Sequence, residues 1–317
     1  MPKPICTLIH FSDPHFGSSF VIDGESWWRN LVAHSPGLRH ISALFPHSYQ
    51  RAVALAHSIR RILADRRDLG IPTVVVHTGD LTASGAASEF SVGATFLSHG
   101  HYLANGTLAG LKLDPPAFDL PGNHDLWSRK SPRALEAFTS HYGGAYPRSL
   151  TIERNGHKVT LHSLDSNRSD LVQHRLARGA IAAEALHEVC ERLRKNRPAT
   201  QVVCLHHPLY LSEEAKPRLF GFEILDLKNR TGIEAALAEA GANLVLAGHV
   251  HTQHAHERNP VQFIAGSACQ IGSHPPAFWL LDLHADEVAF TQMAIPRNAF
   301  QFVDSPIKSG SFANPKD

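Results

Sequence analysis

The sequence carries almost no net charge, because 30 lysine and arginine residues are balanced by 29 aspartate and glutamate residues, for a formal value of +1. A chain with this balance has no overall positive potential that would attract nucleic acid or an anionic membrane. The sequence also shows no basic segment followed by an apolar stretch and a cleavage site, and no apolar run long enough to cross a bilayer. We therefore expect no obligate nucleic-acid partner, no signal peptide and no membrane span.

Cysteine is scarce, and its residues show neither CxxC spacing nor the density of a disulfide framework. The cysteines are Cys6, Cys190, Cys204 and Cys269. A reducing compartment is the simpler interpretation of this pattern, so a cytoplasmic location is predicted. We expect the thiols to be buried as small apolar side chains.

The length of 317 residues and the hydrophobic content of 43% allow the chain to bury a full core. No linker, internal repeat or low-complexity stretch interrupts the chain before its C-terminal region. We predict a single domain over residues 1–303 and a peripheral C-terminal tail over residues 304–317, which is rich in Ser, Pro, Lys and Gly. The oligomeric state stays open, with a homodimer as one option.

Strand-like and helix-like segments alternate along the chain. Helices are expected over residues 49–67, 86–97, 132–141, 180–195 and 232–239. Strands are expected over residues 5–9, 71–77, 117–120, 201–205 and 243–247, and in antiparallel arrangement over 261–265, 277–283 and 287–294. A hairpin is expected from residues 149–153 and 158–165, because Asn155-Gly156 supplies the positive φ angles of a tight turn. The predicted fold class is α/β, a layered sandwich with two sheets.

Histidine is the residue type that stands out, with 23 copies. Several of these fit scattered positions on surfaces and helices, and we set the following ones aside: His34, His40, His47, His57, His99, His101, His141, His174 and His187. The question is whether the histidines at strand ends differ from them.

Five short clusters of His, Asp and Asn each end an apolar, β-branched stretch. In chain order they are Asp13-Pro14-His15, Gly79-Asp80, Gly122-Asn123-His124-Asp125, His206-His207-Pro208 and Gly248-His249-Val250-His251. The carboxyl ends of parallel strands meet at one edge of a sheet, so all five clusters would lie along that edge. This placement can gather seven metal-binding side chains into one pocket.

Each cluster by itself has an ordinary explanation, since Gly, Asp, Asn and Pro are common in turns and helix caps. However, other residues can cap the helix that follows Asp80, which leaves this carboxylate without an evident structural task. An extended chain sends His249 and His251 to the same side, where they make a ready metal pair. It sends His206 and His207 to opposite sides, so only one of these two is expected to be a ligand. A purely structural explanation would need five independent coincidences.

The order of the clusters and the residues that they contain closely resemble the motifs of the calcineurin-like metallophosphoesterase family. Those motifs run D-x-H, GD, GNH[DE], H and GHxH. The motif residues and the chain length are similar to those of the small class III cyclic nucleotide phosphodiesterases. The resemblance implies a four-layer α-β-β-α sandwich, in which helices flank two mixed sheets and a two-metal centre lies at the sheet edge. It implies that one metal is held by Asp13, His15 and His251 and the other by Asn123, His206 and His249, with Asp80 bridging both. His206 is chosen over His207 because the family's ligand commonly stands two residues before a proline.

The chemistry that the resemblance implies is hydrolysis of a phosphate ester through attack by a metal-bridging hydroxide. An anionic phosphoryl group repels hydroxide, and two cations offset that charge and lower the pKa of a bridging water. His124 would interact with the leaving group or a phosphoryl oxygen, and Asp125 could orient its ring through the other nitrogen. Carboxylate, imidazole and amide ligands suit two divalent or trivalent ions of Mn, Fe or Zn.

The favoured substrate is a small phosphodiester of the cyclic nucleotide or glycerophosphodiester type. A phosphomonoesterase or a nucleotide-lipid pyrophosphatase is the alternative, although the related lipid-precursor hydrolases often carry Arg where this chain has His124. A metal-binding scaffold with little catalysis is an alternative from another class, against which the complete ligand set argues. Specificity is expected in the loops 18–48 and 209–230, through residues that could bind a substrate or simply pack and solvate the surface: Trp27, Trp28, Arg29, Lys216, Arg218, Phe220 and Phe222.

Overall fold

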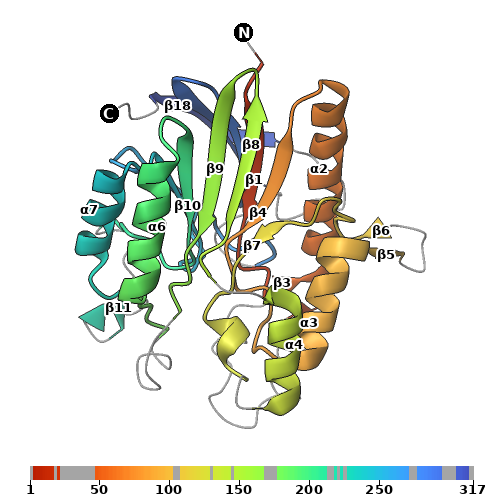
Figure 1. The fold of residues 1–317 in the computed structure, drawn as a ribbon. Helices are drawn as coiled ribbons and strands as arrows, with labels where there is room; N and C mark the ends of the chain where they lie inside the picture. Colours follow the sequence, from red (N-terminus) through yellow and green to blue (C-terminus); the bar gives the residue numbers. More distant parts are fainter. Residues whose placement is uncertain are drawn as a thin grey trace.

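Two six-stranded sheets stack on each other, and helices lie on their outer sides (Figure 1). The computed structural model describes residues 3–17, 20–21, 47–102, 108–128, 131–143, 146–167, 177–212, 218–219, 222–223, 227–270, 277–294 and 305–313. The helix α2 lies on one side of the stacked sheets, and α6 and α7 lie on the other. This arrangement confirms the expected four-layer α-β-β-α sandwich.

The first sheet has the strand order β18-β17-β16-β1-β4-β7. Its strands are β1 (Cys6–Phe11), β4 (Thr73–His77), β7 (Phe118–Asp119), β16 (Ala277–Leu283), β17 (Glu287–Ala294) and β18 (Ser305–Ala313). The strands β1, β4 and β7 run parallel, whereas β16 joins β1 in the antiparallel direction. The carboxyl ends of the three parallel strands therefore lie at one end of the sandwich.

The second sheet has the strand order β14-β15-β13-β10-β9-β8. Its strands are β8 (Ser149–Arg154), β9 (His157–Ser163), β10 (Thr200–Cys204), β13 (Leu244–Ala247), β14 (His254–His256) and β15 (Val261–Ile264). The four central strands are parallel, and the antiparallel strands β8 and β14 form the two edges. This sheet also gathers the carboxyl ends of its central strands at a single edge.

Helices and short ribbons connect the strands. The helices are α2 (Tyr49–Asp68), α3 (Ala87–Ala94), α4 (Pro132–Tyr142), α6 (Ala183–Lys195) and α7 (Arg230–Ala240), with a π turn at Thr95–His99 and a 3₁₀ turn at His124–Leu126. The two-stranded ribbons pair β2 (Phe20–Val21) with β3 (His47–Ser48), β5 (His101–Tyr102) with β6 (Leu108–Ala109) and β11 (Arg218–Leu219) with β12 (Phe222–Glu223). The helix α2 begins where predicted, because the Ser48 hydroxyl accepts a hydrogen bond from the Arg51 backbone N–H.

Three apolar clusters fill the spaces between the four layers. In β1, Ile9 packs with Leu55 of α2, whereas its neighbour Leu8 packs between the two sheets. In β10, Val202 faces the first sheet and Val203 faces α6 and α7. Central strands that are buried on both faces in this way need continuous apolar runs rather than alternating ones. This need explains the β-branched stretches that precede the clusters.

The C-terminal half departs from the sequence predictions in its strand pairing. The predicted strand 261–265 is parallel to β13, not antiparallel like the last two strands of the prediction. Part of the predicted tail, residues 305–313, pairs with β17 as the edge strand β18. The short strand β14 was not predicted. The direction of a strand depends on pairing partners that are distant in sequence, so local composition does not reveal it. A polar composition suits an edge strand as well as a tail, so composition does not distinguish an edge strand from a tail either.

Candidate metal centre

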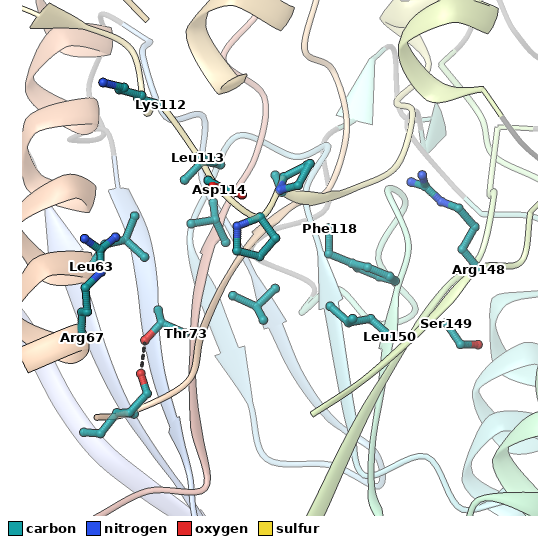
Figure 2. Close-up of a pocket in the computed structure, with 16 residues that line it drawn as sticks. Leu63, Arg67, Thr73, Lys112, Leu113, Asp114, Phe118, Arg148, Ser149 and Leu150 are labelled. Atoms are coloured by element: carbon teal, nitrogen blue, oxygen red, sulfur yellow. Dashed lines mark hydrogen bonds between the residues drawn. The ribbon is translucent and has the colours of Figure 1, made fainter. Parts of the chain in front are cut away.

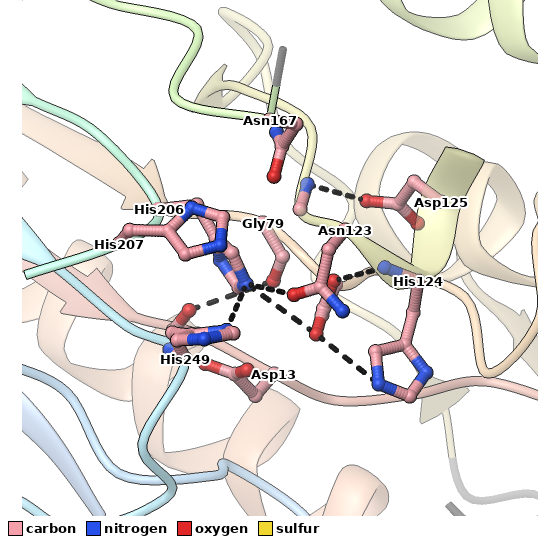
Figure 3. A network of polar contacts seen from close by, with 12 residues as sticks. Asp13, Gly79, Asn123, His124, Asp125, Asn167, His206, His207 and His249 are labelled. Carbon is pink, nitrogen blue, oxygen red and sulfur yellow. Dashed lines mark hydrogen bonds and ion pairs between the residues drawn. The ribbon is translucent and has the colours of Figure 1, made fainter. Parts of the chain in front are cut away.

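Each of the five clusters follows directly after a parallel strand. The strands β1, β4 and β7 of the first sheet lead into the first three clusters, and β10 and β13 of the second sheet lead into the last two. The prediction of one common sheet edge is therefore wrong in one respect, because the clusters divide between two stacked sheets. The carboxyl ends of both sheets meet at the same place, and residues of all five clusters converge there (Figure 3).

The backbone leaves these strands through left-handed turns. Positive φ angles occur at Asp13 (52°), His15 (50°), Asp80 (55°), His249 (75°) and His251 (57°). Such angles cost about 1–3 kcal/mol for a residue with a side chain, although Asp and His tolerate them better than most residues. Five of the seven predicted ligands therefore share this strain, whereas Asn123 has an ordinary φ of −69°.

Two glycines of the clusters allow close approach of backbone and ligand. A Cβ atom at Gly122 would clash with the carboxylate of Asp80, and a Cβ atom at Gly248 would clash with the side chains of Ser12 and Asp13. A larger residue at either position would therefore displace a predicted ligand.

We call Asp13, His15 and His251 the first donor group. The Nε2 atoms of His15 and His251 lie 3.0 Å apart. The Oδ1 atom of Asp13 lies 3.4 Å from the Nε2 atom of His251 and 3.7 Å from that of His15. Asp13 and His15 are fully buried, whereas the side chain of His251 is 22% exposed. The three donor atoms are close enough to share one ion.

We call Asn123, His206 and His249 the second donor group. The Nε2 atom of His206 lies 3.0 Å from Oδ1 of Asn123 and 3.1 Å from Nδ1 of His249. The other ring nitrogen of His206 donates a hydrogen bond to the backbone carbonyl of Thr78, at 2.7 Å. That bond leaves the lone pair of Nε2 directed at the other donors. All three members are buried.

Asp80 lies between the two donor groups. Its Oδ2 atom is 3.6 Å from Nε2 of His15 and 3.4 Å from Nε2 of His206. Its Oδ1 atom accepts the backbone N–H of His124 at 2.8 Å, which fixes the orientation of the carboxylate. One carboxylate oxygen thus faces donors of both groups, as a bridging ligand requires.

The electrostatics of the centre fit a pair of cations. Burial lowers the pKa of His249 to about 3, so the ring is neutral and can offer a lone pair. Burial also lowers the pKa of His206, but the Asp80 carboxylate outweighs it and raises that pKa to about 9. Asp80 thus favours positive charge beside it, and a bound cation would supply that charge while His206 stays neutral. The mixture of carboxylate, imidazole and amide donors suits Mn, Fe or Zn.

His124 lies at the border of the centre. Its Nδ1–H donates a hydrogen bond to the backbone carbonyl of Ala83 at 2.8 Å, and its Nε2 atom lies 3.9 Å from Oδ2 of Asp80. The ring of Trp127 packs against the imidazole, with centroids 3.7 Å apart. Burial lowers the pKa of His124 to about 3, which keeps the ring neutral. A neutral ring held in this way directs the lone pair of Nε2 toward the donor groups.

The prediction that Asp125 orients the His124 ring is wrong, because the Ala83 carbonyl fills that role. The Asp125 carboxylate accepts hydrogen bonds from the backbone N–H groups of Thr82, at 2.8 Å, and Gly122, at 2.9 Å. It also accepts the hydroxyl of Tyr142 at 2.9 Å. Asp125 therefore ties the loop after β4 to the loop after β7 and acts on the centre through their backbones.

The structure brings the seven predicted ligands together, and the ring nitrogens of His206 and His207 have different partners. The His207 ring packs against that of His249, with centroids 4.2 Å apart, but its Nδ1 atom lies 2.9 Å from the hydroxyl of Ser166, whereas Nε2 of His206 lies 3.0 Å from Oδ1 of Asn123. Both histidines are fully buried, so burial alone does not distinguish them. The choice of His206 as the ligand agrees with this geometry.

Three residues near the first donor group were missed by sequence reasoning. His47, which we had assigned to a scattered surface position, is fully buried with its ring centroid 4.8 Å from that of His15. The hydroxyl of Ser267 donates to the backbone carbonyl of Asp13 at 2.6 Å, and Gln270 lies 3.1 Å from a ring nitrogen of His251. Ser267 and Gln270 follow β15, and a parallel assignment of that strand would have placed them at the metal edge.

A cavity of about 540 Å³ lies away from the centre, among α2, β4 and the start of β8 (Figure 2). Its walls include Leu63, Phe118 and Leu150, and none of the predicted ligands lines it.

The loops expected to set specificity lie largely outside the described residues, including Trp27, Trp28, Arg29, Lys216 and Phe220. No helix within the described ranges is long and apolar enough to span a bilayer.

The two-sheet sandwich with paired donor groups at its carboxyl edge is the architecture of a metallophosphoesterase. The family description "Calcineurin-like phosphoesterase" matches residues 6–253, so the chain belongs to this family. The matched range includes all five clusters.

Two solved structures with the same fold are distant from this chain in sequence. A dimetal phosphatase from Danio rerio is 13% identical with a TM-score of 0.60, and the match covers 99% of this chain and 100% of that one. GAP50, the anchor in the inner membrane complex of Plasmodium, is 11% identical with a TM-score of 0.59, covering 98% and 89%. A comparison with curated proteins gave no match.

Proposed function

We propose that the protein hydrolyses a small phosphodiester, of the cyclic nucleotide or glycerophosphodiester type, with a two-metal centre. The observation that carries the proposal is the position of Asp80, whose Oδ2 atom faces His15 at 3.6 Å and His206 at 3.4 Å. The first donor group would hold one ion, the second donor group the other, and Asp80 both. Bound metals would neutralise phosphoryl charge and activate a water for attack.

The position of His124 favours an enzyme over a protein that only binds metal. Its Nδ1–H is fixed by Ala83, so its Nε2 atom is directed at the space beside Asp80 where a phosphoryl group would bind. There the ring would contact a phosphoryl oxygen or the leaving group, the expected role of a positioned imidazole. Asp125 is a positioning residue in this proposal, because its contacts hold the loops that carry Asp80 and His124.

The proposal includes a cytoplasmic location. All four cysteines are buried free thiols, as expected for a protein of a reducing compartment.

The alternatives are a phosphomonoesterase or nucleotide-lipid pyrophosphatase, and a metal-binding scaffold with little catalysis. The fold is shared with a dimetal phosphatase and with GAP50, the anchor in the inner membrane complex of Plasmodium, so the fold admits both classes. The complete donor set together with His124 favours the enzyme, since a scaffold needs no group for the leaving oxygen.

Purified protein loaded with Mn²⁺ tests the proposal against bis(p-nitrophenyl) phosphate, p-nitrophenyl phosphate and cyclic nucleotides. We expect metal-dependent turnover with a higher kcat/KM for the diesters. A preference for the monoester would favour the phosphomonoesterase. Two bound metal ions without turnover of any substrate would favour the scaffold.

A further inference from the structure

Gln270 holds the ring of the one partly exposed histidine in the first donor group. Its side-chain oxygen Oε1 lies 3.1 Å from Nδ1 of His251, so it accepts the hydrogen bond of that nitrogen. A proton on Nδ1 leaves the lone pair on Nε2, and this atom lies 3.0 Å from Nε2 of His15. The contact with Gln270 therefore selects the His251 tautomer that can bind a metal.

Gln270 is itself anchored by the segment around the start of α2. Its backbone carbonyl accepts Nη1 of Arg51 at 3.0 Å, and its backbone pairs with His47 in an antiparallel bridge. The preceding residue, Cys269, accepts the backbone N–H of Ser48 at 2.9 Å. Arg51 is only 6% exposed, so this anchor is shielded from solvent.

The partner of His251 differs in kind from the partners of two other histidines of the centre. His206 and His124 donate to the backbone carbonyls of Thr78 and Ala83, which no side-chain substitution removes. The partner of His251 is a side-chain amide, and the His251 side chain is 22% exposed. The Gln270 side chain, outside the family motifs, therefore contributes to the orientation of this ligand.

We infer that Gln270 is a positioning residue that sets the metal affinity of the first donor group. The inference rests on the proposed function, because it assumes that Asp13, His15 and His251 bind a metal. Removing the outer hydrogen-bond partner of a ligating histidine typically lowers metal affinity about 10- to 100-fold. The second donor group has no contact with Gln270 among the described residues and keeps its ion in this proposal.

The test compares Gln270→Met, which has a similar length but no amide, with Gln270→Glu, which keeps an acceptor for Nδ1. Gln292→Met is the matched control, because Gln292 donates to Gln253 at 2.8 Å and is not part of a donor group. Metal content after dialysis is measured by elemental analysis, and Mn²⁺ affinity by titration calorimetry. Electron paramagnetic resonance distinguishes a coupled Mn pair from a single ion, and thermal melting reports on the fold.

We expect Gln270→Met to retain one metal equivalent where the wild type retains two, with about 10- to 100-fold weaker binding of the second. Gln270→Glu and Gln292→Met should retain both. The inference is overturned if folded Gln270→Met binds two ions with wild-type affinity, or if Gln270→Glu loses an ion as readily as Gln270→Met. A wild type that binds fewer than two ions would instead contradict the proposed function.

Discussion

The two donor groups are built from different kinds of structure. In the second group, Asn123, His206 and His249 are all buried, and the His206 ring is held by the backbone carbonyl of Thr78 just past the end of β4. In the first group, His251 is partly exposed and its ring is held by Gln270, from the segment after β15. The His206 ring is thus held by backbone at a strand end, whereas the His251 ring is held by a side chain of a connecting segment.

This difference teaches that a two-metal centre need not respond evenly to change. A backbone carbonyl beside a strand end moves only if the sheet moves, whereas a side-chain amide can be replaced without disturbing the sheet. We therefore expect the second group to depend on the stability of the fold and the first to depend on a few local contacts.

The largest expected effect comes from Asp80, because its carboxylate lies between the two groups and faces both. Asp80→Ala should lower phosphodiester turnover by about a thousand-fold or more, equivalent to about 4 kcal/mol of transition-state free energy. Metal content should fall in both groups together. Steady-state kinetics and elemental analysis check this, and turnover that survives the substitution would contradict the two-metal mechanism.

Replacing the exposed Asp286 by Ala is a control for Asp80→Ala, since this carboxylate lies in the turn between β16 and β17. Turnover and metal content should both stay at the wild-type level. A comparable loss in this variant would mean that the Asp80 effect is not specific to the centre.

His124→Ala addresses the chemistry rather than either donor group. A positioned imidazole contributes about 100- to 10,000-fold to such reactions, so kcat should fall within that range. Metal content should stay near the wild-type value, because Ala at this position keeps the backbone N–H that Asp80 accepts. An equal loss of metal and turnover would make His124 a structural residue instead.

His206→Ala and His251→Ala compare the groups directly in the metal-free protein. His206 forms a buried pair with Asp80, so its loss leaves a buried carboxylate and should lower the free energy of unfolding by about 3 kcal/mol. His251 is partly exposed, and its loss should cost about 1 kcal/mol or less. Urea denaturation measures both, and equal losses would remove the distinction between the groups.

The smallest expected effect on the metal centre itself comes from the support beneath it. Tyr142→Phe removes one of the hydrogen bonds to the buried Asp125 carboxylate and should lower the free energy of unfolding by about 1–2 kcal/mol. Metal content should not change, because the Thr82 and Gly122 contacts remain. Tyr146→Phe serves as the control, and a larger loss there would contradict the assigned role of Tyr142.

The sequence predicted the elements that local rules control. Asn155-Gly156 predicted a hairpin, and both residues have positive φ angles, 54° and 78°. The apolar runs before the clusters predicted buried parallel strands, and β1, β4, β10 and β13 confirm this. The parallel direction of β15 was not predicted, because a run such as 261–265 looks the same in either direction.

The site shows the same division between features that local sequence predicts and features that depend on tertiary packing. The clusters stood out because each lies just past a recognisable strand, and their resemblance to the calcineurin-like family implied the seven candidate ligands and His124. The actual partner of the His124 ring, Ala83, is a backbone carbonyl that any residue could supply, so no sequence signal marks it. His47 and Gln270 reach His15 and His251 only through tertiary packing.

The sequence by itself determined which residues can carry the chemistry: five clusters of His, Asp and Asn, each at the end of an apolar stretch. The tertiary structure alone decided that these clusters divide between two sheets, that Asp80 lies between the donor groups, and that Gln270 holds His251. The physical reason is that these two kinds of property depend on different distances along the chain. Side-chain chemistry and turn propensity are local properties of the chain, whereas sheet pairing and the choice of a hydrogen-bond partner depend on residues that only folding brings together.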